Sequence, residues 1–105
     1  MEEIMDKIIK FQKERDWKKF HMPENLSKSI SIEAAELLEH FQWGKEYDVG
    51  EVSEELADVL IYCLYMVDSL DLDVKEIIFN KVEKNALKYP VEKSRGNAKK
   101  YTEFL

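Results

Sequence analysis

The chain has 105 residues, of which 36% are charged, and a formal net charge of −6. This length predicts a single domain, residues 1–105, with a small core that partner chains would help to complete. An acidic protein is a poor candidate for non-specific binding to nucleic acid polymers. The longest uncharged run, Val59 to Val67, has nine residues, and a membrane-spanning helix needs about 20. Because the N-terminus is charged from its second residue, no signal peptide is expected, and we predict a cytoplasmic protein without a membrane partner.

The charges are unevenly distributed along the chain. Residues 29–74 hold one basic and twelve acidic side chains, whereas residues 75–105 hold eight basic and four acidic ones. Residues 1–28 are nearly balanced, with seven basic and six acidic groups. An acidic centre beside a basic C-terminal third suits a ligand in which a metal cation accompanies a polyphosphate.

Helical patterns follow one another along the chain. Apolar side chains recur at helical spacing in residues 2–20, in a second segment from about 23 or 24 to 43, and in a third from about 52, or 51, to 69. A fourth helix is predicted over residues 74–88, followed by a basic tail, residues 91–105, without a helical period. The tail is expected to be ordered only by packing on the body. With three Gly, two Pro and no alternating strand pattern, we predict an all-α bundle of four to five helices.

The third and fourth helices carry apolar surface that we expect to be buried. The third is apolar nearly all round after Asp58, which predicts burial on every side, partly against a second subunit. On the fourth, we expect four apolar residues to face inward: Ile77, Ile78, Val82 and Leu87. The same helix carries a basic stripe of Lys81, Lys84 and Lys88.

Two short acidic motifs stand out on the second and third helices. Glu33 and Glu36 lie one helical turn apart, as do Glu55 and Asp58, and all four are flanked by Ala and Leu. A short connection predicts that the two helices pair antiparallel, which sets Glu36 level with Glu55 and Glu33 level with Asp58. We therefore expect four carboxylates to surround one point.

Four neighbouring carboxylates repel one another, so either their pKa values rise or a cation neutralises them. Oxygen ligands without Cys, and without a Glu-x-x-His element, favour Mg²⁺, for which Mn²⁺ can substitute. The alternative is that these acids form an ordinary solvated helix face, the commoner role of two acids at this spacing. Both motifs at matched depth on adjacent helices, without basic partners at i±4, favour the metal site.

These motifs resemble those of the MazG-like all-α nucleoside triphosphate pyrophosphohydrolases, and the dCTP pyrophosphatase branch in particular. The resemblance extends from about Phe11 to Glu103 and departs only in the Phe104-Leu105 ending. It is carried by the following segments in order: Arg15-Asp16-Trp17-x-x-Phe20-His21-x-Pro23-x-Asn25-Leu26, Glu33-x-x-Glu36-Leu37-x-Glu39-x-Phe41-Gln42-Trp43, Glu54-Glu55-Leu56-Ala57-Asp58-Val59-Leu60-Ile61-Tyr62, Lys84-Asn85-x-x-x-Tyr89-Pro90 and Lys100-Tyr101-Thr102-Glu103.

The resemblance implies a compact helical fold whose active sites are shared between subunits of a tetramer or a dimer. It implies Mg²⁺-dependent hydrolysis of a nucleoside triphosphate, most specifically dCTP or a modified form, to the monophosphate and pyrophosphate, in clearance of the nucleotide pool. Metal ligands would be the four motif acids: Glu33, Glu36, Glu55 and Asp58. One of these carboxylates, or a neighbour such as Glu39 or Glu54, would orient or deprotonate the attacking water.

The remaining candidate residues would hold the nucleotide. The aromatic candidates for the base are Trp17, His21, Trp43 and Tyr62, although aromatic residues at helical spacing commonly belong to a core and His21 could instead join two helices by a hydrogen bond. The candidates for the phosphates are Lys81, Lys84 and Asn85, although a lysine stripe is more often solvated surface. Two other functions stay open: a related enzyme with a broad or different base preference, such as dUTP or damaged nucleotides, and a non-catalytic helical oligomerisation module.

Overall fold

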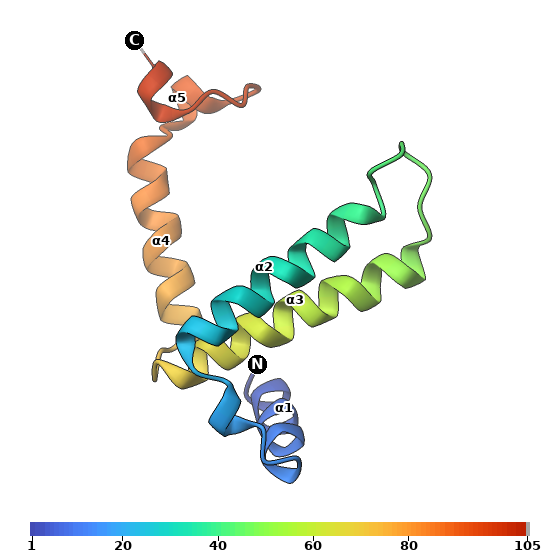
Figure 1. Ribbon diagram of the computed structural model, residues 1–105. Coiled ribbons are helices and arrows are strands. Elements are labelled where there is room, and N and C mark those ends of the chain that lie inside the picture. The colour runs from blue at the N-terminus through green and yellow to red at the C-terminus, as the bar shows by residue number, and fades with distance from the viewer. Residues whose placement is uncertain (105) are drawn as a thin grey trace. The chain divides into compact units, whose positions relative to one another are not determined.

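The computed structural model describes residues 1–104, and these form helices without strands (Figure 1). The α-helices are α1 (Glu2–Glu14), α2 (Pro23–Glu39), α3 (Val49–Ser69), α4 (Val74–Lys88) and α5 (Val91–Ser94), with 3₁₀ turns η1 (Lys18–Phe20) and η2 (Tyr101–Glu103). The predicted all-α class is confirmed. None of the helices in residues 1–104 has the length and apolar character that crossing a bilayer requires. The chain divides into two compact units, which meet between Leu72 and Asp73 in the sequence.

The first unit is an antiparallel hairpin of α2 and α3, against which α1 packs through α3 (Figure 1). Its buried apolar residues are Leu26 on α2 and Tyr65 on α3. The Tyr65 hydroxyl donates a hydrogen bond of 2.8 Å to the backbone carbonyl of Ile8 on α1. This bond and the ring's burial fix α1 to the hairpin near the middle of the helix.

Helix α1 ends at Glu14, six residues before the predicted end at residue 20. Asp16 adopts a left-handed conformation with φ of 52°, one that Asp tolerates better than most residues. The Trp17 N–H then donates to the Gln12 carbonyl at 3.0 Å, and the Asp16 N–H donates to that of Lys13 at 3.1 Å. These bonds close the helix end. The chain turns there, and η1 brings His21 back beside α1.

Helix α2 ends at Glu39 and not at the predicted residue 43. The N–H groups of residues 40–42 each donate to the carbonyl three residues back, the pattern of 3₁₀ turns. The α-helix therefore ends before these residues. Helix α3 starts at Val49, earlier than predicted, because the Asp48 carboxylate caps it by accepting from the Glu51 N–H at 3.0 Å. The loop between the two helices is therefore shifted toward the N-terminus of the chain relative to the prediction.

The second unit contains α4, with the predicted bounds, and two short elements. Asp73 caps α4 by accepting from the Glu76 N–H at 2.9 Å. The prediction of a tail without helix is wrong, because α5 and η2 form within it and Tyr89 packs edge-on against the rings of Tyr101 and Phe104. Leu105, the last residue of the chain, lies outside the described residues.

Within the second unit, the apolar residues of α4 that we expected to face inward stay exposed. None of the residues of α4 is buried, and the exposed fractions of the four side chains are 38% for Ile77, 52% for Ile78, 60% for Val82 and 83% for Leu87. The four-residue α5 and the short η2 are too small to cover a helix of 15 residues. The apolar face of α4 is left without a partner from its own unit.

Candidate active site

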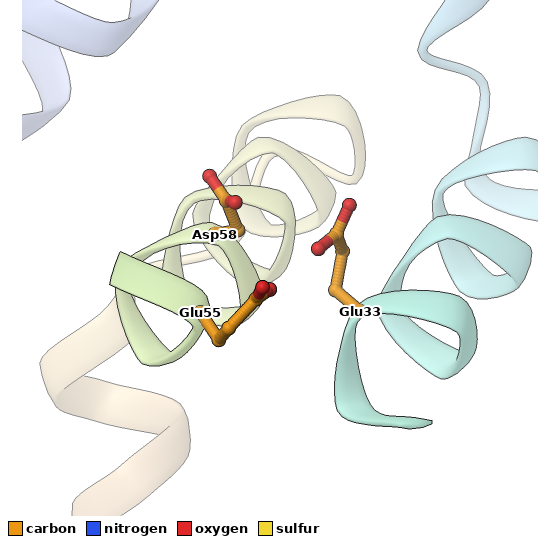
Figure 2. A group of neighbouring side chains, drawn as sticks. All are labelled: Glu33, Glu55 and Asp58. Atoms are coloured by element: carbon orange, nitrogen blue, oxygen red, sulfur yellow. The ribbon is translucent and has the colours of Figure 1, made fainter. Parts of the chain in front are cut away.

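Three carboxylates meet between α2 and α3. Glu33 lies on α2, while Glu55 and Asp58 lie one turn apart on α3, and an oxygen of each lies within 4.8 Å of the others. Figure 2 shows the Glu33 side chain pointing across the gap toward the two acids of α3. The antiparallel pairing of the helices accounts for this meeting, because it places the second acidic motif beside the first.

Glu36 joins the same group, which we call the acidic cluster: Glu33, Glu36, Glu55 and Asp58. Burial is the largest cause of the raised pKa of both Glu33 and Glu55, and Glu36 raises each pKa further through its charge and hydrogen bonding. The structure therefore brings all four predicted acids together. Their role as metal ligands stays a prediction.

Two acids of the cluster, Glu33 and Glu55, hold their protons more tightly than free carboxylic acids do. Burial raises the pKa of Glu33 from its ordinary 4.5 to about 7, with further contributions from Glu36 and from the charges of Asp58 and Glu55. Burial, followed by Glu36, also raises the pKa of Glu55, which His40 partly offsets. Without a counter-cation, the repulsion within the cluster is thus relieved in part by protonation.

Two oxygens of the cluster indicate where a cation would fit. Glu33 Oε2 and Glu55 Oε2 are both buried without a hydrogen-bond partner, an arrangement that costs free energy unless something positive contacts them. Oxygens bound to one Mg²⁺ lie at most about 4.2 Å apart, twice the usual bond length. The oxygens of Glu33, Glu55 and Asp58, which lie within 4.8 Å of one another, need only small side-chain rotations to reach that spacing. The donor set, all carboxylate oxygen, fits a hard divalent cation.

His40 is a member of this site to which the sequence analysis gave no role. Its Nε2 lies 3.7 Å from Glu55 Oε1 and its Nδ1 lies 3.9 Å from Glu51 Oε2. These distances allow an electrostatic contact and are too long for a strong hydrogen bond. The signal in the sequence was its position four residues after Glu36, which continues the acidic stripe of α2 toward the helix end.

An aromatic cavity of about 490 Å³ adjoins the cluster, with Asp58 in its wall. Three of the predicted base-binding residues line it: Trp17, His21 and Tyr62. The His21 ring meets those of Trp17 and Tyr62 edge-on, with centroids 6.4 and 6.1 Å apart. Burial, followed by the charges of Glu33 and Asp58, raises the pKa of Tyr62, which places its hydroxyl in the field of the acidic cluster.

Two residues near this cavity were missed by sequence reasoning. Lys7 lines it and supplies a cation beside the aromatic rings. Gln12 is buried, with 2% of its surface exposed, and its amide lies 2.7 Å from His21 Nδ1. The signal for Gln12 was its place four residues after Ile8, in the apolar row of α1.

The structure does not bring Trp43 to the aromatic cavity. Because α2 ends early, Trp43 lies in the turn after it, with 90% of its surface exposed, and lines a separate hollow together with Glu39 and His40. The predicted phosphate contacts, Lys81, Lys84 and Asn85, are exposed on α4. They belong to the second unit, so the first unit by itself does not bring them to the acidic cluster.

The model of the MazG-like family matches residues 28–104, which include the whole acidic cluster. Two curated relatives cover 99% of this chain over 114 aligned residues: dCTP pyrophosphatase 1 of Mus musculus, at 36% identity, and that of Homo sapiens, at 34%. The chain covers 67% of the length of each of these relatives.

A solved structure agrees with the sequence relatives. The crystal structure of a pyrophosphatase from Archaeoglobus fulgidus is 47% identical and superposes with a TM-score of 0.80. The match covers 86% of this chain and 92% of the other. The predicted resemblance, including that to dCTP pyrophosphatases, is confirmed, and the chain belongs to the MazG-like family.

Proposed function

We propose that this protein hydrolyses dCTP, or a modified dCTP, to the nucleoside monophosphate and pyrophosphate in the presence of Mg²⁺, and so clears unwanted triphosphates from the nucleotide pool. The relatives named dCTP pyrophosphatase 1 and the pyrophosphatase structure support the broader class, a nucleoside triphosphate pyrophosphohydrolase. The choice of cytosine as the base is taken from the names of these relatives.

One observation carries the proposal: Asp58 belongs both to the acidic cluster and to the wall of the aromatic cavity. A triphosphate bound there would have its base among aromatic rings and its phosphates beside the carboxylates. Bare carboxylates would repel those phosphates, so the arrangement makes chemical sense only with a cation between them.

Glu33, Glu36, Glu55 and Asp58 would hold that cation, Mg²⁺ or, in substitution, Mn²⁺. When bound, the metal would neutralise phosphate charge and favour attack at phosphorus. The unpaired, buried oxygens of Glu33 and Glu55 support this set of ligands. His40, beside Glu55, would help to hold that carboxylate in place.

The residues of the chain would position the reaction and accept its proton. Water would attack the α-phosphorus, the bond from that phosphorus to the bridging oxygen would break, and pyrophosphate would leave. The proton of the water would pass to a carboxylate and then to solvent. That carboxylate would be one of the acidic cluster or an exposed neighbour, Glu39 or Glu54. No covalent intermediate is needed, because pyrophosphate paired with a cation is a good leaving group.

The base would lie among Trp17, His21 and Tyr62, which line the cavity. Stacking on such rings contributes about 1–3 kcal/mol per base. Four other residues stay proposed nucleotide contacts: Trp43, Lys81, Lys84 and Asn85. They would reach the nucleotide from another part of the chain or from another subunit. Lys7 is an additional candidate for the phosphates because it lines the cavity itself.

The active form would be a homo-oligomer, a tetramer or otherwise a dimer, in which residues 1–105 act as one catalytic domain. Among residues 1–104, the apolar side chains buried in the single chain are Leu26 and Tyr65 alone, too small a core for a stable fold. Leu60 on α3 is 53% exposed and Val82 on α4 is 60% exposed. A second copy of the chain is the partner that would cover such surfaces.

The experiment is a panel of the deoxynucleoside and ribonucleoside triphosphates incubated with purified protein and Mg²⁺, with the rate of monophosphate formation measured for each. We expect dCTP and its modified forms to give the highest kcat/KM. A preference for dUTP or a damaged nucleotide would replace cytosine as the base. If none of the triphosphates is hydrolysed, the proposed enzymatic function is contradicted and a non-catalytic oligomerisation module is favoured.

Two variants test the acidic cluster within the same panel. Glu36→Gln and Asp58→Asn keep the size of each side chain but remove a charge, and we expect turnover to fall by at least about a hundredfold in each. Helical content, measured by circular dichroism, should be unchanged. Wild-type rates in both variants would remove these residues from the active site.

A further inference from the structure

Gln12 holds a buried amide against one edge of the His21 ring. Its side chain is 2% exposed, and its Nε2 lies 2.7 Å from His21 Nδ1. Its other polar atom, Oε1, is buried and has no hydrogen-bond partner among the described residues. A buried amide is costly unless it makes hydrogen bonds, and the contact that this one makes is with His21.

The geometry favours one arrangement of protons. If the amide N–H donates, His21 Nδ1 is an acceptor and the neutral ring carries its proton on Nε2. The reversed amide would accept from an Nδ1–H but would leave both of its own N–H groups unpaired in a buried place. Unpaired buried donors are rarer than under-satisfied carbonyls. Burial also lowers the pKa of His21, which favours the neutral ring.

The ring is held from several sides. It stacks on Tyr65, with centroids 4.9 Å apart and planes 26° from parallel, and meets Trp17 and Tyr62 edge-on. His21 lines the aromatic cavity. Nε2 lies on the edge of the ring opposite Nδ1, makes no hydrogen bond within residues 1–104 and is not sealed from solvent. It is therefore the ring atom free to meet a ligand.

We propose that Gln12 is a positioning residue that fixes neutral His21 with its proton on Nε2, so that the cavity presents one N–H donor to the base. Cytosine offers acceptors to such a donor at N3 and O2, whereas uracil and thymine carry an N–H at N3. The donor thus favours cytosine where it meets N3. This assignment rests on the proposed function for its ligand, but the state of the ring itself can be measured without substrate.

The first test determines directly which ring nitrogen of His21 carries the proton. Two-bond ¹H–¹⁵N NMR spectra of protein labelled in histidine distinguish a protonated from an unprotonated ring nitrogen. The chain has two histidines, so a His40→Gln variant identifies the His21 signals. At neutral pH we expect Nε2 to be protonated and Nδ1 unprotonated. In Gln12→Glu, whose carboxylate can only accept, Nδ1 should become protonated. An Nδ1–H ring, or a mixture of forms, in the wild-type protein would overturn the inference.

The second test measures how Gln12 affects recognition of the base. Gln12→Met keeps the length and burial of the side chain but cannot donate a hydrogen bond. We expect KM for dCTP to rise about tenfold, the equivalent of one hydrogen bond of about 1.4 kcal/mol, with kcat within about threefold. The ratio of kcat/KM for dCTP over dUTP should fall. A Gln12→Met enzyme with wild-type KM and base preference would overturn the role, even where the NMR result holds. If the wild-type protein itself hydrolyses no triphosphate, the proposed function is refuted instead.

Discussion

Glu33 offers the sharpest perturbation, because its pKa is raised from 4.5 to about 7 by burial and by the other acids of the cluster. Without metal, ionising Glu33 in the folded state therefore opposes folding. Replacement by Gln, which has the shape of the protonated acid, removes that penalty. We expect the metal-free Glu33→Gln protein to be more stable than the wild type at pH 8, although the variant would lose its activity.

The magnitude follows from the pKa shift. Each unit corresponds to about 1.36 kcal/mol, so full conversion of the shift would give about 3 kcal/mol. Asp58 is exposed at one side of the cluster, so solvent reaches the site and weakens both the burial penalty and the repulsion between the acids. We therefore expect about 1–2 kcal/mol. For a domain of about 100 residues, that corresponds to an increase in Tm of roughly 5–10 °C.

The sign of the pH dependence is fixed by the direction of the shift. A group whose folded pKa is raised stabilises the fold below its unfolded pKa, and that contribution is lost as the pH rises through the folded value. Here the window runs from about 4.5 to about 7. At pH 5 the folded wild type holds its proton on Glu33, and the difference in Tm between wild type and variant should be small. At pH 8 it should be largest.

The assay is thermal unfolding followed by circular dichroism, in EDTA, at pH 5 and pH 8 and at equal protein concentrations, since an oligomer's Tm depends on concentration. Glu39→Gln, an exposed residue on the same helix, is the matched control and should show no such difference. Added Mg²⁺ should raise the Tm of the wild type more than that of Glu33→Gln. The reasoning fails if Glu33→Gln melts no higher than the wild type at pH 8, or if its advantage is the same at both pH values.

Two further predictions concern the structure around the site. Tyr65→Phe removes the 2.8 Å bond to the Ile8 carbonyl, and should lower the free energy of unfolding by about 1 kcal/mol. Denaturant unfolding measures this loss against Tyr101→Phe, whose hydroxyl makes no side-chain hydrogen bond in the described residues, and equal stability of the two variants would contradict it. Val82→Glu places a charge on the exposed apolar face of α4, and should reduce the molar mass measured by light scattering if that face joins subunits. An unchanged mass at micromolar concentration would exclude Val82 from the interface.

The helices and the meeting of the acids could be predicted because both depend on local periodicity and on one antiparallel turn. Asp73 and Tyr89 bound α4 where its pattern begins and ends. Glu33 and Asp58 come together because a short loop leaves the two helices only one way to pair. Such features follow from spacing along the chain, which a sequence displays directly.

What could not be predicted depends on backbone conformation and on contacts between distant segments. The left-handed Asp16 that ends α1 gives no periodic signal, and the unwinding after Glu39 occurs in a segment whose apolar spacing still looks helical. Gln12 was missed because its importance depends on His21, nine residues away and across a turn. The apolar pattern of α4 predicts a covered face, but it does not tell whether the same chain or another copy would cover it.

The most direct test of the central claim is to identify the products formed from dCTP. Wild-type protein with Mg²⁺ is expected to release dCMP and pyrophosphate in equal amounts, and to stop when EDTA removes the metal. The Asp58→Asn protein, which alters the one residue shared by the acidic cluster and the aromatic cavity, should release neither. Formation of dCDP and orthophosphate, or undiminished turnover in Asp58→Asn, would contradict this account of the site.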